Sequence, residues 1–487
     1  MNLFSILEEA GKRRPEDTAV VHGDRSFRYA DLHAASESLA IKLRQAGVQA
    51  GDKVGVMNPS SLEYLISFFA VVRLGAIVIS ISPALKATEI ADLAEEMGLD
   101  AFCYSARLKA LVPEGRGGGL TEVRAFAGGT PLTIQLAANR NTPHWEREQL
   151  LGMKVAWIRF SSGTTAKAKG IILSHATLLE RMNLREEGFF CSAGDSILYL
   201  GSMGGRIPSP GFFSLGVKIV IADVIEMEGL AALVRQYGVT EIYGSPMVYR
   251  ALLNEPGITA EDFRGVRYFM STASSLSSSI AEAFRAKFGR EIVQRYGSGE
   301  CGGVMTNFNE DASKRGSVGK PKPSMEVKLV SGKSYSSEGE AMGELFVRGP
   351  GMFDAYYKPW RLRDEVLEDG WFRTGDIAQR DADGYYWIVG RVKDVINVGG
   401  VKVFPSEIEA TLLKHPGVEE AVVYGAPEPR FGEAPHAKVK LRSGAACRQR
   451  ELLRYVNERL SVFKALRGVE FVEEIPKTVT GKPRRVG

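Results

Sequence analysis

The sequence predicts an α/β protein with three parts: a large N-terminal domain of layered α/β sheets, a small β-rich subdomain, and a small α+β domain at the C-terminus. Helix-like and strand-like segments alternate over roughly 300 residues, which indicates helices packed on largely parallel sheets. Near residue 316 the pattern changes to short strands separated by turn residues. At 487 residues the chain is also longer than one typical domain.

The alternation can be followed from the N-terminal end. Residues 29–47 carry apolar side chains at helical spacing and stop at a glycine, and residues 52–59 form a short apolar run that ends at a proline. The same order, helix and then strand, repeats in three further pairs of segments: 61–75 with 76–83, 228–238 with 239–246, and 278–289 with 291–300. Parallel strands joined by helices are the expected result.

Three other segments have a different character. Residues 113–120, PEGRGGGL, predict a flexible loop. Residues 316–349 contain the short strands of the β-rich subdomain. Residues 381–391 predict a β-hairpin with Asp383-Gly384 at its turn.

A compact α+β unit follows Lys393, beginning with a helix-like segment at 406–417. We therefore expect one domain over residues 1–391 and a second over residues 392–487.

Composition excludes several classes of protein. The chain is 44% hydrophobic and 25% charged, and 62 basic against 58 acidic side chains give a net charge of only +4. This small charge, without zinc-ligand spacing or an aromatic-basic surface pattern, argues against a nucleic-acid partner. The four cysteines are scattered without a CxxC pair, which fits a reducing cytoplasm. The longest apolar run, 65–81, is interrupted by Arg73 and Gly75, and the acidic N-terminus is no signal peptide, so no transmembrane segment is expected.

The segment 159–170, RFSSGTTAKAKG, is rich in hydroxyls, glycines and lysines and follows an apolar run. Backbone N–H groups and hydroxyls at the end of a strand are typical of a cradle for anionic oxygens. Lys169 can add a positive charge for a phosphate. The segment is not a Walker A loop, and its composition alone fits a polar surface turn equally well.

Four later segments also carry side chains suited to binding. Tyr296-Gly-Ser-Gly-Glu300 follows an apolar strand, where α/β proteins bind ligands, and offers an aromatic ring and a carboxylate. The segment 371–376, WFRTGD, places Asp376 beside a glycine turn, where it can accept ribose hydroxyls. The glycine-rich segment 390–400 and the basic tail 476–482 complete the set. Taken singly, each also fits a solvated turn or a chain end.

Their order along the chain resembles the adenylate-forming superfamily of acyl- and aryl-CoA synthetases, luciferases and adenylation domains. SSGTTAKAKG is similar to the family's phosphate loop and YGSGE to its Tyr-Gly-x-Thr-Glu motif. WFRTGD, GRVKDVINVGGVKVFPSEIE and PKTVTGK resemble the ribose, hinge and C-terminal lysine motifs. The resemblance runs from Thr18 to the C-terminus.

The resemblance implies a role for each matching residue. It implies that ATP phosphates contact the loop residues Ser162, Thr164, Thr165 and Lys169, that adenine lies between Tyr296 and the wall containing Ala273, and that Glu300 binds Mg²⁺. Asp376 is expected to hold the ribose and Arg391 the ribose or phosphate. Lys482 and Lys169 are the expected catalytic cations. Lys393 is the expected hinge of a mobile C-terminal domain, and Gly399-Gly400 is expected to line the acceptor tunnel.

Three departures from the family pattern stand out. The phosphate loop has Ala166 and Ala168 where glycine and proline are usual, and YGSGE has Gly299 in place of threonine. Gly204 stands where many relatives carry a histidine near the substrate carboxyl group. Arg206 is either a substitute partner for that group or a solvated arginine.

The expected function is an ATP-dependent acid–CoA ligase that activates a small-molecule carboxylic acid and releases AMP and pyrophosphate. The expected cofactors are ATP, Mg²⁺ and coenzyme A, or the phosphopantetheine of an acyl carrier protein. Two alternatives stay open: transfer to a carrier protein or another nucleophile, and a non-catalytic nucleotide-binding relative. The sequence does not identify the acid, and its expected contacts are Met203, Gly204, Arg206 and Ser245.

Overall fold

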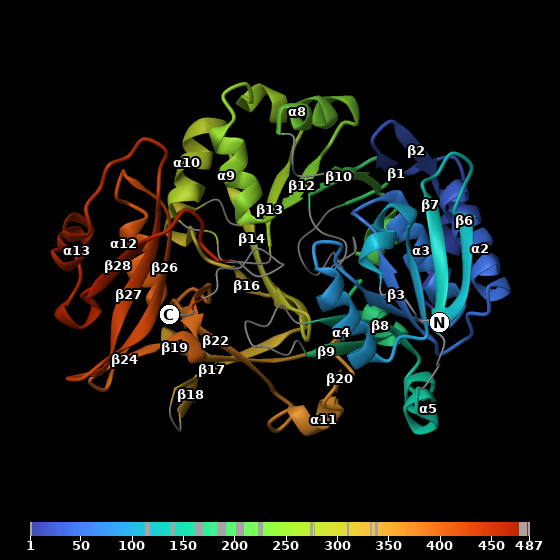
Figure 1. Cartoon of the computed structure of the whole chain (residues 1–487). Helices are drawn as coiled ribbons and strands as arrows, with labels where there is room; N and C mark the ends of the chain where they lie inside the picture. The colour runs from blue at the N-terminus through green and yellow to red at the C-terminus, as the bar shows by residue number, and fades with distance from the viewer. Residues whose placement is uncertain are drawn as a thin grey trace.

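The computed structural model describes residues 2–112, 117–137, 142–160, 169–182, 191–200, 209–222, 227–272, 276, 278–308, 311–331, 334–336, 339–476 and 485. Figure 1 shows two large sheets with their helices, a smaller sheet, and a C-terminal unit, coloured orange to red, at one side. The helices are α1 (Phe4–Arg13), α2 (Tyr29–Gln45), α3 (Leu62–Arg73), α4 (Ala87–Met97), α5 (His144–Gly152), α6 (His175–Glu180), α7 (Pro210–Leu215), α8 (Met227–Gln236), α9 (Pro246–Asn254), α10 (Ser278–Phe288), α11 (Arg363–Val366), α12 (Pro405–Leu412) and α13 (Gln449–Asn457).

The first nine-stranded sheet is parallel through its centre and antiparallel at both edges. Its order is β16 (Lys320–Pro321), β15 (Gly302–Asn307), β14 (Ile292–Ser298), β13 (Tyr268–Ser271), β12 (Glu241–Gly244), β10 (Ser196–Tyr199), β11 (Lys218–Ile221), β1 (Thr18–His22) and β2 (Arg25–Arg28). The parallel centre is what the alternating helices and strands predict.

The second nine-stranded sheet has a parallel centre of four strands, β8, β4, β3 and β5. Its order is β21 (Arg361–Leu362), β20 (Ala355–Tyr357), β9 (Gly170–Ser174), β8 (Val155–Phe160), β4 (Ile77–Ser80), β3 (Lys53–Met57), β5 (Ala101–Ser105), β7 (Pro131–Ala137) and β6 (Gly117–Arg124). Strand β20 joins this sheet from a distant part of the chain, by antiparallel pairing with β9.

Side-chain alternation along the strands arranges the two sheets in layers. In β4, Val78 faces the core shared by both sheets, whereas Ile77 and Ile79 pack with residues of α4 on the outer face. In β11, Ile219 faces the shared core and Val220 packs with residues of α8, α9 and α10. The order is therefore helices, sheet, central helices, sheet, helices.

Helix α3 lies in the central layer and explains the long apolar run in the sequence. All its residues are buried except the last, Arg73. Ser61 caps its first turn by accepting a hydrogen bond from the N–H of Tyr64. A helix that is apolar on every side belongs to the interior of a large protein, because no face of it is left for water.

Two smaller sheets complete the fold. The β-rich subdomain has the order β18 (Ser334–Ser336), β17 (Glu326–Ser331), β19 (Ala341–Arg348), β22 (Phe372–Arg380) and β23 (Tyr386–Arg391). The C-terminal unit contains β25 (Val401–Val403), β24 (Ile396–Val398), β27 (Gly432–Leu441) and β26 (Val418–Glu428), with β28 (Gly468–Phe471) beside β27. Helices α12 and α13 pack on this sheet.

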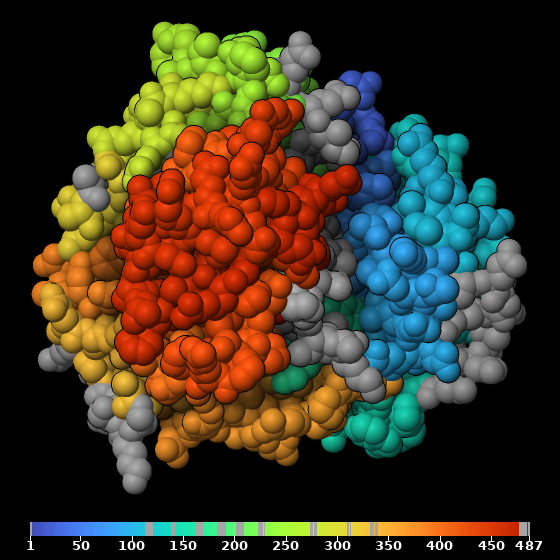
Figure 2. All heavy atoms as spheres, turned by 60° about the vertical axis from the view of Figure 1, so that its left-hand side comes forward, coloured from blue at the N-terminus to red at the C-terminus, as the bar shows by residue number. Residues whose placement is uncertain are grey.

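The C-terminal unit lies against the large domain (Figure 2). Arg250 of α9 forms an ion pair with Glu420 of β26, with 2.9 Å between Nη1 and Oε1. The hydroxyl of Ser406, in α12, donates to the carbonyl oxygen of Val389 in β23. These contacts define the position of the C-terminal unit in this structure.

Most of the predicted elements agree with the fold, but three places differ. The β-rich subdomain, predicted at residues 316–349, also includes β22 and β23, whereas β16 pairs in the first large sheet. Residues 117–120 are not loop but the start of β6, because they pair with β7; residues 113–116 lie outside the described part of the chain. The hairpin is longer than predicted. Its turn is at Asp383-Gly384, but its first strand, β22, lies before residue 381 because buried residues of the neighbouring β19 extend the pairing.

No helix in the described part of the chain is long and apolar enough to cross a membrane.

A buried charge cluster joins β3, α5 and β20. Lys53 Nζ lies 2.5 Å from Glu146 Oε1 and 2.8 Å from the Tyr357 hydroxyl, which also donates to Glu146 Oε1 over 2.6 Å. Lys53 and Glu146 are almost fully buried. Burial lowers the pKa of Lys53, against the opposing effect of the Glu146 carboxylate. Each charge therefore depends on the other for its place in the interior.

We expect Lys53→Met to destabilise the protein by about 3–5 kcal/mol, because it leaves the Glu146 carboxylate buried without its cation. Lys53→Met with Glu146→Gln should lose less, since the amide can still accept from Tyr357. Denaturant unfolding would measure both, with the exposed Lys109→Met as control. A double variant no more stable than Lys53→Met would contradict this account.

Candidate active site

Residues from three sheets meet at the carboxyl end of β14. Tyr296 lies near the end of β14, and Glu300 lies in the turn between β14 and β15. Lys169 immediately precedes β9 of the second large sheet. Asp376 and Arg391 are paired residues of β22 and β23 in the small sheet. The carboxyl ends of parallel strands are the usual place for a ligand site in α/β proteins.

The Asp376 carboxylate is held from two sides. The Tyr296 hydroxyl donates to Oδ2 over 2.7 Å, and Arg391 Nε donates to Oδ1 over 2.7 Å. Burial raises the pKa of Tyr296, and the Asp376 carboxylate raises it further. Burial opposes the charge of Arg391, but Asp376 outweighs it and raises the pKa of the guanidinium. A carboxylate has about four lone-pair positions, so Asp376 can still accept two hydroxyl groups.

A second carboxylate, Glu300, is held by a tyrosine that the motifs did not indicate. The hydroxyl of Tyr356, in β20, donates to Glu300 Oε1 over 3.0 Å. Lys169 Nζ lies 5.1 Å from the centre of the Tyr356 ring, within the range of a cation–π interaction. Burial and the nearby Glu300 carboxylate raise the pKa of Tyr356. The Tyr356 side chain therefore contacts both a cation, Lys169, and an anion, Glu300.

Arg181, which follows α6, shapes the turn that carries Glu300. Its Nη2 donates to the carbonyl oxygens of Gly299 (3.1 Å) and Glu300 (2.9 Å), and its Nε donates to that of Gly351 (2.6 Å). Desolvation lowers the pKa of Arg181 to about 10, so the guanidinium stays charged at neutral pH. Neither Arg181 nor Tyr356 belongs to a glycine-rich motif. The only signal in the sequence that could have indicated them is that each is a basic or aromatic residue beside a buried strand.

The two glycines of YGSGE are explained by close packing. A Cβ on Gly297 would collide with the carbonyl oxygen of Gly302 in β15. A Cβ on Gly299 would lie 2.5 Å from Cδ1 of Ile171, which is buried in β9. The glycine in place of threonine at 299 is therefore matched by an isoleucine that occupies the space.

The other predicted site residues lie in several places. Ser245 follows β12 and precedes α9, at the same edge of the sheet as Tyr296. Lys393 lies in a short 3-10 turn between β23 and β24. Gly399 (φ 58°) and Gly400 (φ 90°) form the two-residue turn between β24 and β25, which needs left-handed backbone at both positions.

The remaining predictions fall outside the described residues, so the structure does not test them. They are the phosphate-loop residues Ser162, Thr164 and Thr165, the adenine-wall residue Ala273, the substrate candidates Met203, Gly204 and Arg206, and Lys482.

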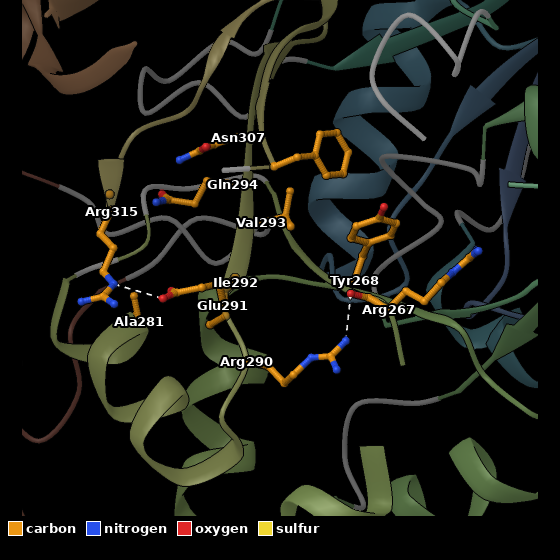
Figure 3. Close-up of a pocket in the computed structure, with 12 residues that line it drawn as sticks. Arg267, Tyr268, Ala281, Arg290, Glu291, Ile292, Val293, Gln294, Asn307 and Arg315 are labelled. Atoms are coloured by element: carbon orange, nitrogen blue, oxygen red, sulfur yellow. Dashed lines mark hydrogen bonds and ion pairs between the residues drawn. The ribbon is translucent and has the colours of Figure 1, made fainter. Parts of the chain in front are cut away.

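A separate small hollow of about 50 Å³ lies at the amino ends of β13 and β14 (Figure 3). Its arginines have partners within the fold: Arg290 donates to the carbonyl oxygen of Arg267 (3.2 Å), and Arg315 Nε pairs with Glu291 (3.1 Å). Arg267 pairs with Asp195 at 2.7 Å. These arginines fasten the starts of the strands, and the hollow is at the opposite end of the sheet from Glu300.

The chain is similar in sequence to known nucleotide-binding proteins. The family model described as AMP-binding enzyme matches residues 7–357, and the model described as AMP-binding enzyme C-terminal domain matches residues 407–482. A feruloyl-CoA synthase from an Amycolatopsis species is 29% identical, covering 96% of this chain and 94% of its own. A fatty acid–[acyl-carrier-protein] ligase of Streptomyces coeruleorubidus is 29% identical, covering 97% and 92%.

Among solved structures, ATP-bound MatB from Rhodopseudomonas palustris has a TM-score of 0.84 at 24% identity. The similarity covers 99% of this chain and 97% of that one. At this identity the similarity establishes the fold alone.

We expect Gly299→Thr to lower stability by about 1–3 kcal/mol, because its Cβ overpacks against Ile171. Ile171→Val removes the Cδ1 methyl group and should restore most of the loss in the double variant. Thermal unfolding of both single variants and the double variant measures this coupling. Strictly additive losses would show that Ile171 is not the obstacle.

Proposed function

The chain belongs to the AMP-binding enzyme family, and we propose that it is an ATP-dependent ligase for a small carboxylic acid. In the first half-reaction, a carboxylate oxygen of the acid bonds to the α-phosphorus of ATP and pyrophosphate leaves. In the second, the thiol of coenzyme A attacks the acyl carbonyl carbon, a thioester forms and AMP leaves. The proton of the thiol passes to solvent.

The observation that carries this proposal is the convergence of Tyr296, Glu300 and Asp376 with Lys169 and Arg391 at one strand end. An aromatic ring can pack against adenine, carboxylates can hold ribose hydroxyls or a metal ion, and cations can bind phosphates. They come from three sheets, so their meeting is not a consequence of a single local motif.

For the nucleotide, we assign the ribose to Asp376, whose remaining lone pairs can accept two hydroxyls. The ring of Tyr296 lies at the same place and its orientation is set by its hydrogen bond to Asp376, so it can pack against adenine. Arg391, already bonded to Asp376, adds a cation for the ribose or a phosphate. Ser162, Thr164, Thr165 and Lys169 are assigned to the phosphates and Ala273 to the adenine wall.

The residues present also fit Mg²⁺. Glu300 has one carboxylate oxygen that accepts from Tyr356, which leaves further lone pairs for a cation. When bound, the ion would neutralise charge on the phosphates. Tyr356 fixes the Glu300 carboxylate, and Arg181 fixes the backbone beneath it.

The first half-reaction brings two anions together, so it needs cations fixed in advance. We assign Lys482 to the oxygens of the attacking carboxylate and the nucleotide, where it aligns the attack and stabilises the developing charge. Lys169 acts on the phosphate side. A covering C-terminal domain also keeps water from the adenylate.

The second half-reaction requires Lys482 to leave and a thiol to enter. We propose the boundary between domains at residues 391–392, with rotation at Lys393, since the small sheet ends at Arg391 and the next begins at Ile396. The exposed Gly399-Gly400 turn would then line the path of the thiol.

The relatives act on aromatic and on fatty acids, so both classes belong in a substrate test. We assign the acid to the sheet edge near Ser245, together with Met203, Gly204 and Arg206. The scattered cysteines support a cytoplasmic location.

The test combines protein, ATP and Mg²⁺ with hydroxycinnamic acids and with fatty acids of graded length. We expect acid-dependent pyrophosphate release, and a thioester by mass spectrometry when coenzyme A is added. If the acyl group of the adenylate is transferred only to a holo carrier protein, the carrier protein replaces coenzyme A as the acceptor in this proposal. Nucleotide binding without pyrophosphate release, over the whole panel, would overturn the proposal.

Tyr356→Phe should keep the ring beside Lys169 but lose the hydrogen bond to Glu300. One such bond contributes about 1 kcal/mol, so we expect a several-fold higher Mg²⁺ requirement for adenylation. Titration of pyrophosphate release against Mg²⁺ measures it. Tyr237→Phe, which removes the hydroxyl of a half-buried tyrosine that donates to the carbonyl oxygen of Gly23, is the control. An unchanged Mg²⁺ requirement in Tyr356→Phe would remove Tyr356 from the site.

Lys482→Ala should lower adenylation by about 10²–10³-fold, because one fixed cation is lost from the transition state. Thioester formation from a supplied acyl-adenylate should be largely spared. Separate assays of the two half-reactions decide this, with the exposed Lys414→Ala as control. Equal losses in both would contradict the rotation of the C-terminal domain.

A further inference from the structure

Arg485, near the end of the chain, is fastened by two carboxylates of the C-terminal unit. Its Nη1 lies 3.2 Å from Asp394 Oδ2, and its Nη2 lies 3.0 Å and 2.8 Å from the two carboxylate oxygens of Glu409. Asp394 ends the 3-10 turn that contains Lys393, and Glu409 lies in α12. We call Arg485, Asp394 and Glu409 the tail anchor.

The tail anchor is sheltered from solvent. The side chains of Arg485, Asp394 and Glu409 are 28%, 16% and 14% exposed. Glu409 Oε1 also accepts from the N–H of Val423 in β26, over 2.8 Å. Burial raises the pKa of Glu409, while the Arg485 guanidinium opposes that rise. A guanidinium shared by two largely buried carboxylates holds its position much better than an exposed ion pair.

The anchor restricts the residues just before it. Lys482 precedes Arg485 by three residues, and three residues of fully extended chain span at most about 11 Å. Wherever the tail lies, the Lys482 backbone must remain within that distance of Arg485. Since Asp394 and Glu409 belong to the C-terminal unit, Arg485 moves with that unit in the proposed rotation.

We propose that Arg485 is a positioning residue for adenylation, because the tail anchor fixes the chain segment that delivers Lys482. This inference rests on the proposed function. The bond to Asp394, the neighbour of Lys393, also attaches the tail directly beside the hinge. Arg485 itself touches neither nucleotide nor acid in this assignment. It acts by holding the tail so that Lys482 meets the reacting oxygens.

The test compares Arg485→Ala and Arg485→Lys with wild type in the two half-reactions. For Arg485→Ala we expect adenylation at saturating ATP and acid to fall about 10- to 100-fold, as misplacing a catalytic group by an ångström does. Thioester formation from a supplied acyl-adenylate should be unchanged. Arg485→Lys should recover only part of the loss, because an ammonium cannot pair with both carboxylates as a guanidinium does.

Two controls separate positioning from general stability. Arg450→Ala removes an exposed arginine from α13 of the same unit and should leave both half-reactions intact. Glu409→Gln keeps the shape of the side chain and should reproduce the selective loss even if Arg485→Ala does not fold. If Arg485→Lys and Glu409→Gln lose both half-reactions equally, or lose neither, the proposed positioning role of the tail anchor is overturned. Absence of acid activation in wild type would instead overturn the proposed function.

Discussion

The geometry of the candidate site depends on the hydrogen bonds from Arg181 to the backbone that carries Glu300. The Arg181 guanidinium donates to three carbonyl oxygens in the partly buried junction of the two large sheets, and these oxygens would lose a partner without it. The turn at Gly299-Glu300 and the approach to β20 at Gly351 are held by the same side chain. The position of the Glu300 carboxylate follows from that bond network.

Two tyrosine hydroxyls orient the two carboxylates of the site by donating hydrogen bonds to them. Tyr296 donates to Asp376 and Tyr356 donates to Glu300, in each case across an interface between sheets. Each hydroxyl orients a carboxylate without neutralising it, which leaves lone pairs available for ribose hydroxyls or a cation. The rigidity of the site therefore comes from aromatic side chains packed in the sheets. Its charges come from the strand residues Asp376 and Arg391 and from Glu300 and Lys169, which lie beside strand ends.

The C-terminal unit extends the same arrangement to the part for which we propose rotation. Arg391 binds Asp376 just before the proposed hinge at Lys393, and Asp394 binds Arg485 just after it. The proposed hinge thus lies between two arginine–carboxylate contacts, one within the large domain and one within the C-terminal unit. Rotation between them can change which residues face the nucleotide while both ends keep their own geometry.

The sequence by itself determined the α/β class and the parallel centres of the sheets, because periodicity is local. Its motifs, through their resemblance to a family, also indicated Lys169, Tyr296, Glu300, Asp376 and Arg391 as candidate site residues. It predicted neither Arg181 nor Tyr356, and it showed Gly299 only as a departure from the family pattern. Their contacts join residues 56 to 170 positions apart. Only the packing of separate sheets brings such residues together. The fit of Gly299 to Ile171 was likewise decided by tertiary structure, because no local pattern records which side chain fills the space beside a glycine.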